Sequence, residues 1–199
     1  MSGRRMSLCR AIILLLIAGS AIAAGQEQRH HWTSRGTVEL GGSATYQSVW
    51  GVVNGNTSNS PAFIFSAMPF VGYFVIDGLE LGLNPAGIVV SGGTGRSTVT
   101  QLRALFAPSY NFRTSTVSTP FVEGLAGVTT QTTDATGGGT ATLAGFTWGG
   151  RAGIKVALTD RGLLTIGVEY LLVTLNPPGA SARNGYNELS VSAGWTVWF

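Results

Sequence analysis

The sequence almost lacks cysteine. Its single cysteine, Cys9, lies in an amino-terminal segment that we expect to be removed from the mature chain. The mature chain then has neither thiols nor disulfides, which excludes thiol chemistry and cysteine-ligated metal sites. Its stability must come from buried surface and hydrogen bonds.

Charge is also scarce. Charged residues make up 11% of the chain, against roughly 25% in ordinary globular proteins. The mean hydropathy of +0.27 and the 29 glycines give a balance opposite to that of disordered chains. Much of the net charge of +3 comes from Arg4, Arg5 and Arg10. The composition therefore indicates no nucleic-acid partner.

Long apolar runs are absent beyond the amino terminus. The first residues combine three arginines with the apolar core "AIILLLIAGS" and the small residues Ala21 and Ala23, which is typical of a secretory signal peptide. A short membrane anchor is the alternative, but the run falls below the roughly 20 residues that a spanning helix needs. We expect a signal peptide over residues 1–23, with cleavage after Ala23 or Ala24, and an extension over residues 24–35.

From residue 36 the sequence alternates between apolar and small or polar residues. The last segment, "NELSVSAGWTVWF", is apolar at every second position, as in a strand with two different faces. The pattern predicts about eight strands, two of them less clear: residues 62–76, where Pro69 suggests a bulge or local break, and residues 120–129. The others are residues 36–47, 78–84, 100–112, 146–158, 163–172 and 187–199.

The connections alternate in length. Residues 47–61, 91–97, 130–141 and 174–185 form long polar or glycine-rich segments, whereas Asp77-Gly78, residues 113–119 and residues 159–162 are shorter. Long loops at one end and short turns at the other are typical of an outer-membrane barrel inserted from the periplasm. The sequence predicts an all-β fold: an eight-stranded, antiparallel, up-and-down transmembrane β-barrel over residues 36–199.

Alternation alone also fits a soluble lipocalin-like barrel, apolar inside and polar outside. Three observations favour the opposite arrangement: polar faces made mainly of Gly, Ser and Thr, single charges on successive strands, and aromatic residues near strand ends. Inside an eight-stranded barrel the charges can pair across the lumen. The predicted interior charge network comprises Glu39, Glu80, Arg103, Glu123, Arg151, Lys155, Glu169 and Glu188. The last strand then closes on the first and leaves no free edge.

The segments "ELGGSATYQ", "VGYFVIDGLELGL" and "GRAGIKVALTDRG" and the terminal aromatic strand resemble the small bacterial outer-membrane β-barrel family, the OmpX-like and OmpA-barrel-like proteins. The resemblance covers the chain from residue 36. It implies location in the outer membrane of a Gram-negative bacterium, with outer-membrane lipid around the barrel. It also implies that the barrel-assembly machinery reads an assembly signal formed by Phe199, Val197 and Trp195.

The resemblance specifies architecture better than role, because the family includes adhesins, structural barrels and a few enzymes. Its enzymatic members need a histidine beside a serine or carboxylates. The only histidines here, His30 and His31, precede the first strand and are interpreted as part of a solvated extension. Asp134 has no catalytic partner, and "SGGTGRS" has no helix after it to bind phosphate. We therefore predict no enzyme activity, no cofactor and no metal.

Two functional classes remain. The first is a structural or interaction scaffold, with a lumen occluded by interior ion pairs and with loops that bind an extracellular ligand. The second is a small channel or porin for ions or small solutes, in which the same charges line a pathway. With about eight strands a filled interior is expected, so the sequence favours the scaffold.

Overall fold

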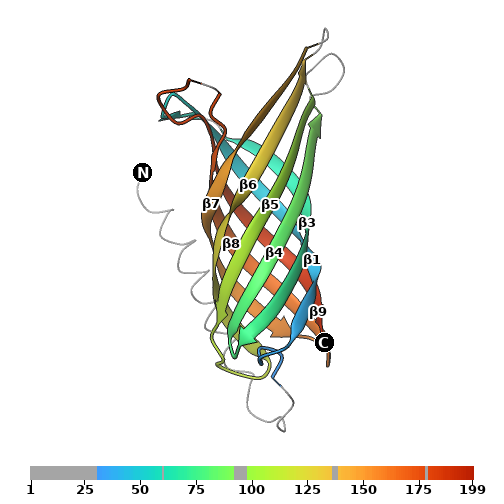
Figure 1. Ribbon diagram of the computed structural model, residues 1–199. Coiled ribbons are helices and arrows are strands. Elements are labelled where there is room, and N and C mark those ends of the chain that lie inside the picture. The colour runs from blue at the N-terminus through green and yellow to red at the C-terminus, as the bar shows by residue number, and fades with distance from the viewer. Residues whose placement is uncertain (1–30, 60, 92–97, 136–138, 178) are drawn as a thin grey trace, which may run out of the picture.

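The fold is a meander of antiparallel strands, each paired with the next along the chain (Figure 1). The computed structural model describes residues 31–59, 61–91, 98–135, 139–177 and 179–199, without the side chains of residues 87–91 and 135. The strands are β1 (Val38–Val53), β2 (Asn56–Thr57), β3 (Ala62–Ile76), β4 (Leu79–Ser91), β5 (Thr98–Asn111), β6 (Ser118–Ala135), β7 (Gly139–Ala157), β8 (Gly162–Thr174) and β9 (Gly185–Trp198).

The sheet closes on itself. Strand β1 pairs with β3 on one side and with β9 on the other, in a continuous register from Glu39↔Trp198 to Val52↔Gly185. The two-residue β2 only folds back on the tip of β1, so the wall consists of eight long strands. The predicted eight-stranded antiparallel barrel is confirmed. Within the described residues, no helix is long and apolar enough to cross a membrane.

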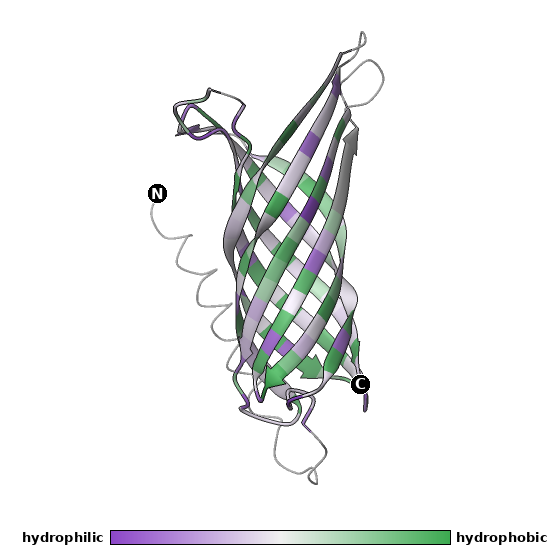
Figure 2. Cartoon of the chain, in the orientation of Figure 1, coloured by the Kyte–Doolittle hydropathy of each residue, from purple (hydrophilic) through white to green (hydrophobic). Residues whose placement is uncertain are grey.

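The two faces of the barrel wall differ in polarity, with the apolar face outside and the polar face inside, as the sequence favoured. Along β5 the side chains of Leu102, Phe106 and Tyr110 are exposed on the outer surface, while those of Gln101 and Arg103 are buried inside. The other long strands follow the same alternation, and Figure 2 shows the resulting bands of apolar and polar residues. A polar interior and an apolar exterior rule out the lipocalin-like arrangement.

One end of the barrel, here called the turn end, carries the short β3–β4, β5–β6 and β7–β8 connections and the carboxyl terminus (Figure 1). The opposite end is called the loop end. At the turn end Gly78 has a φ of 81°, which glycine adopts without strain. The β3–β4 connection is therefore the tight Asp77-Gly78 turn that the sequence predicts.

Pro69 does not interrupt its strand. Strand β3 keeps its register with β1 through the Gly42↔Pro69 pair, so a break at this position is wrong. A shift in register occurs instead between Phe74 and Ile76, opposite β4. Strand β4 also runs to Ser91, seven residues beyond the predicted end at Asn84. The ladder between β3 and β4 nevertheless stops at Val71↔Leu83.

Residues 31–37 fold across the turn end of the barrel. The side chain of Trp32 is 3% exposed and packs with Phe74 and Leu163, and Thr33 is fully buried. Backbone bonds hold the segment, with the Gly78 N–H donating to the Thr33 carbonyl at 2.9 Å. The expectation of a solvated extension is therefore wrong for Trp32 and Thr33. The predicted signal peptide and His30 lie outside the described residues.

Candidate functional site: the charged lumen

The lumen contains all eight residues of the predicted charge network. Seven of these side chains are buried, and Arg151 is partly buried. They come from seven strands: Glu39 from β1, Glu80 from β4, Arg103 from β5, Glu123 from β6, Arg151 and Lys155 from β7, Glu169 from β8, and Glu188 from β9. The strict alternation of each strand places these side chains on the inner face.

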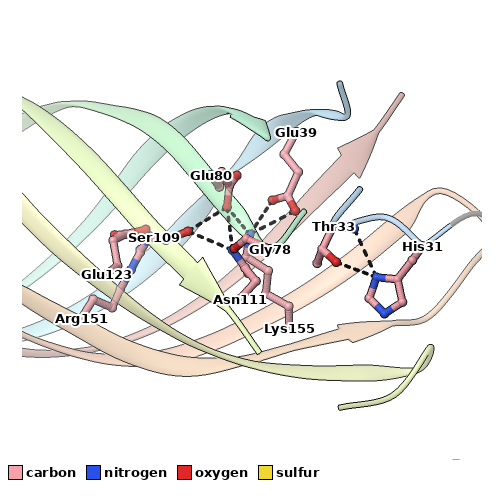
Figure 3. Close-up of polar contacts among 10 residues, drawn as sticks. All are labelled: His31, Thr33, Glu39, Gly78, Glu80, Ser109, Asn111, Glu123, Arg151 and Lys155. Carbon is pink, nitrogen blue, oxygen red and sulfur yellow. Dashed lines mark hydrogen bonds and ion pairs between the residues drawn. The ribbon is translucent and has the colours of Figure 1, made fainter. Parts of the chain in front are cut away.

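The group nearest the turn end is built around Lys155. Its Nζ donates to Glu39 Oε1 and Oε2 at 3.0 and 2.9 Å and to Glu80 Oε2 at 2.8 Å. Figure 3 shows both carboxylates converging on the ammonium group, with Ser109 and Asn111 also bonded to Glu80. One lysine of β7 therefore neutralises two carboxylates, one from β1 and one from β4.

Aromatic rings surround the Lys155 ammonium group. The distances from its Nζ to four ring centroids lie between 5.6 and 5.8 Å, and the rings are those of Trp32, Phe70, Phe74 and Phe121. This range favours cation–π attraction. Phe70 also fills the space above Gly72 and Gly82, where an added Cβ would collide with its ring. The lumen is thus filled by rings as well as by charges.

A second group lies further from the turn end. The Arg151 guanidinium contacts Glu123 Oε1 at 2.8 Å and Oε2 at 3.0 Å. Glu123 and Arg151 are direct cross-strand partners, as are Arg151 and Glu169. Glu169 is buried, but its Oε1 has no hydrogen-bond partner among the described residues. The guanidinium therefore lies between two carboxylates and is bonded to one of them.

The third group lies closest to the loop end. The Arg103 guanidinium makes a two-pronged contact with Glu188, at 2.8 Å to Oε2 and 3.4 Å to Oε1. It also donates to the Tyr186 hydroxyl at 3.2 Å, which Gln101 contacts as well. Bidentate pairs of this kind are among the stronger ionic contacts in proteins.

Apolar side chains separate these groups. Leu105, Ala107, Leu125 and Leu171 form a buried cluster, and the first two lie between Arg103 and Ser109 along β5. This cluster breaks the polar pattern expected of the inner face. Together with the ion-pair groups, it fills the interior along the barrel axis, as expected for eight strands.

The network carries more negative than positive charge. Five glutamates face three cations, so the formal charge of the lumen is negative. Glu39 and Glu80 share Lys155, whereas Arg151 is bonded to Glu123 and has Glu169 as its other cross-strand neighbour. The described residues contain no cluster of three or more acidic, histidine or cysteine side chains arranged to hold a metal ion.

Several functional side chains in the lumen were missed by sequence reasoning. Trp32 precedes the first strand, and Tyr186 begins the last one just after a predicted loop. His31 lies at the turn end, where its Nε2 is 3.0 Å from the Ser115 carbonyl oxygen and its Nδ1 is 2.7 Å from Thr33 Oγ1. Too few alternating apolar and polar residues flank these three side chains for the sequence to indicate that they face inward.

The residues of the predicted assembly signal lie on the closing strand. Trp195 and Phe199 are exposed on the outer surface, and Val197 is partly exposed. The Phe199 N–H donates to the Val38 carbonyl at 3.0 Å, and the Val38 N–H donates back at 3.1 Å. The backbone of the terminal residue thus makes the last pair of hydrogen bonds between β1 and the end of the chain.

The described residues line two hollows that bear on a pathway along the barrel axis. One of about 20 Å³ lies beside Lys155 and Arg151. The other, of about 100 Å³, lies toward the loop end above the Arg103–Glu188 pair, and three glutamines and Tyr186 contribute to its polar lining. Neither hollow extends through the three ion-pair groups to the turn end.

Comparison with known proteins shows the fold. The chain is similar to neisserial surface protein A (TM-score 0.60, 18% identity, 83% of this chain and 100% of that one). It is also similar to Ail of Yersinia pestis in complex with the heparin analogue sucrose octasulfate (0.52, 10%, 81% and 99%). A third similar structure is the outer-membrane protein AlkL in lipid bilayers (0.53, 14%, 89% and 97%). No family model and no curated protein sequence matches the chain.

These similarities agree with the physical argument. A closed barrel satisfies its backbone hydrogen bonds between strands, and an apolar outer surface around a polar lumen requires lipid. The chain is therefore an outer-membrane β-barrel protein of a Gram-negative bacterium, with the fold of the small eight-stranded barrels that its sequence resembles.

Proposed function

We propose that the protein is an outer-membrane scaffold that presents its loops to the exterior and does not conduct through its axis. The observation that carries this proposal is the stack of three ion-pair groups, centred on Lys155, Arg151 and Arg103, with Trp32 packed beneath them. The proposed function involves no catalysis and no cofactor.

The energetics of the ion pairs support a permanently filled lumen. Removing one partner of a buried ion pair costs about 3–5 kcal/mol, because the other charge stays in a poorly solvating interior, and parting an intact pair is unfavourable for the same reason. An ion moving along the axis would have to disturb all three groups in turn. Thermal fluctuations open a gap of this kind too rarely for a steady current.

The loops are then the part of the molecule that can bind a partner. Residues 47–61 contain no charged residue, and the other three long loops contain Arg96, Asp134 and Arg183 in total. The Arg183 guanidinium is already bonded to the Asn187 side chain and to two backbone carbonyls. The loops therefore lack the basic cluster that a heparin-like ligand requires, and we propose an uncharged or weakly charged partner.

The channel remains the second candidate, and the loop-end hollow favours it. That hollow of about 100 Å³ is lined by Gln47, Gln101, Gln131 and Glu188, among others, and can hold a few water molecules. A channel would need this hollow to connect with the turn end when the Arg103–Glu188 pair parts.

Planar-bilayer recording separates the two candidates. The purified full-length protein is incorporated alongside a general porin measured under the same conditions as a positive control. We expect no steady current from the protein at neutral pH. A steady, ion-selective conductance would overturn the scaffold and support the channel.

A loop variant tests the binding role. The β6–β7 hairpin projects at the loop end, with pairing up to Ala135↔Gly139. Replacing residues 133–141 by Asn-Gly leaves the Thr132↔Thr142 pair joined by a two-residue turn. Wild type and variant are compared on arrays of glycans and matrix proteins, after a heat-modifiability gel confirms that both are folded. We expect loss of a salt-insensitive interaction, and equal binding by the two proteins contradicts the role of this loop.

We also propose that the barrel-assembly machinery reads the terminal residues of β9. Phe199, Val197 and Trp195 present a row of apolar side chains at alternate positions. The Phe199 ring is 62% exposed on the outer surface, so the fold makes little use of it. Recognition by the assembly machinery before the barrel closes would give Phe199 a role that its packing in the folded barrel does not.

A further inference from the structure

The barrel wall has a seam between β3 and β4. The two strands pair only from the turn end to Val71↔Leu83, although β3 stays paired with β1 up to Ala62 and β4 with β5 up to Ser91. Continuing the β3–β4 register would place Pro69 opposite Pro85. Proline has no N–H to donate, so both strands lose a donor at the same level and the ladder ends.

The seam opens within the apolar band of the barrel. At about 3.3 Å per residue and a tilt of about 40°, the paired stretch rises roughly 15 Å from the turn end. The lipid-facing band of such barrels is about 25 Å tall. Beyond the last pair, β3 still presents Phe65 (72% exposed) and Phe63 outward. Unpaired strand edges at this depth are unfavourable unless another group covers them.

A hollow of about 420 Å³ lies beside the seam. Outward-facing apolar residues of three neighbouring strands line it, together with Pro69 and two buried residues of the inner face. The outward-facing residues on these strands include Pro85, Leu102, Ala104 and Val128, and the inner ones are Ala86 and Arg103. The hollow thus opens on the lipid-facing surface and borders Arg103, whose side chain points into the lumen and is 0% exposed.

Arg103 supplies a polar contact that the protein does not use. Its two terminal nitrogens bond Glu188 and Tyr186, but its buried Nε has no hydrogen-bond partner among the described residues. A buried donor without an acceptor costs about 1–3 kcal/mol in general. An oxygen-bearing group that passes from the hollow between the unpaired edges of β3 and β4 would satisfy it.

We propose that the β3–β4 seam binds one single-chain amphiphile, a fatty-acid-like molecule. Its carboxylate or hydroxyl head enters between the unpaired edges of β3 and β4 and accepts from Arg103 Nε, and its hydrocarbon tail lies over Pro85, Leu102 and Ala104. The volume is near the lower end of the roughly 300–1,000 Å³ of small-molecule sites, which suits one chain rather than a lipid with several. The site is independent of the proposed loop function, because it faces the bilayer rather than the exterior.

Photo-crosslinking in phosphatidylcholine nanodiscs tests this site. The probes are a diazirine-labelled palmitate and, separately, a phosphatidylcholine with the same label in one chain. We expect palmitate adducts to concentrate on the residues that line the hollow and to be displaced by unlabelled palmitate. Adducts spread evenly around the barrel, or stronger labelling of the seam by the phosphatidylcholine probe, would overturn the proposal.

A matched pair of variants sharpens the test. Ala104→Trp fills the hollow, whereas Ala193→Trp adds the same ring to the outer face of β9. Displacing two methylene groups of the tail weakens binding roughly tenfold, so Ala104→Trp should lower labelling by at least this factor. Ala193→Trp should leave labelling of the seam unchanged. Equal labelling of the two variants would refute a site in the hollow.

The role of Arg103 is tested by Arg103→Lys, which keeps the charge and removes Nε. In wild type, palmitate should outcompete the alcohol of equal chain length, because its head is a charged acceptor. The variant should lose this preference while retaining tail-dependent labelling. An unchanged preference in folded Arg103→Lys would show that the head group does not contact Arg103.

Discussion

Replacing Lys155 by methionine should destabilise the barrel more than any other single change to its lumen charges. Lys155 is the only cation within 3.0 Å of both Glu39 and Glu80 among the described residues, and its side chain is 5% exposed. Methionine keeps most of the apolar volume and removes the charge. The variant therefore leaves two buried carboxylates facing each other without a counter-ion.

The size of the effect follows from the burial of the pair. Removing one partner of a buried ion pair typically costs about 3–5 kcal/mol, because the other charge stays desolvated. Here two carboxylates lose the same partner and repel each other, which places Lys155→Met at the upper part of that range. The four aromatic rings around Nζ lose their cation–π contact as well.

Urea unfolding of the protein refolded in detergent micelles measures this loss. The matched control is Arg113→Met, because the Arg113–Asp77 pair is short, at 2.6 Å, but its side chains are 40% and 55% exposed. An exposed pair is worth about 0–1 kcal/mol. The triple variant Lys155→Met, Glu39→Gln, Glu80→Gln should recover part of the loss, since it removes the unpaired charges. If Lys155→Met costs no more than Arg113→Met, the ion-pair group does not stabilise the barrel.

Three further outcomes are expected. Trp32→Ala should cost about 3 kcal/mol in detergent unfolding and should release its segment so that trypsin cleaves after the exposed Arg35, and unchanged resistance to cleavage would show that Trp32 does not anchor the segment. The Arg35 backbone N–H and the Arg113 guanidinium hold the pKa of Asp77 below its usual value. Their contribution is complete above about pH 3.9 and is lost as the pH falls through the lowered pKa, which the Arg35 amide resonance reports and Asp77→Asn abolishes. Phe199→Ala, which keeps both backbone bonds to Val38, should reduce outer-membrane yield in cells far more than stability in detergent, and a normal yield would contradict its role as an assembly signal.

The fold could be predicted because each strand faces lipid on one side and the polar, packed lumen on the other. Lipid requires apolar side chains at every second outward position, and this constraint holds regardless of which strands are neighbours. Leu102, Phe106 and Tyr110 on β5 therefore revealed both the strand and its outer face. The ends of the strands were predicted less accurately, as the extension of β4 to Ser91 shows. Near the loop end neither lipid nor the packed lumen requires apolar and polar residues to alternate.

The inward charges could be predicted as a set but not as pairs. Lys155 bonds Glu39 across the barrel, 116 residues away, and Arg103 bonds Glu188, 85 residues away. Such partners are fixed by the stagger of the closed sheet and not by sequence spacing. The apolar cluster of Leu105, Leu125 and Leu171 was hidden for a related reason. Inside a filled barrel, an inward side chain has to pack against its neighbours across the lumen, and an apolar side chain can do this as well as a polar one.

The seam shows a sequence signal that depends on pairs of residues. Pro69 alone looks like a defect of its own strand, yet β3 accommodates it against β1 without a break. Its consequence appears only with Pro85, because the register shift between Phe74 and Ile76 brings the two prolines to the same level on either side of the Asp77-Gly78 turn. In an antiparallel hairpin with one extra residue in one strand, residues whose distances from the turn differ by one face each other, so two such prolines remove donors from both strands at one level. Reading prolines in pairs about a predicted turn would therefore locate where a barrel wall stops pairing, which no single proline can show.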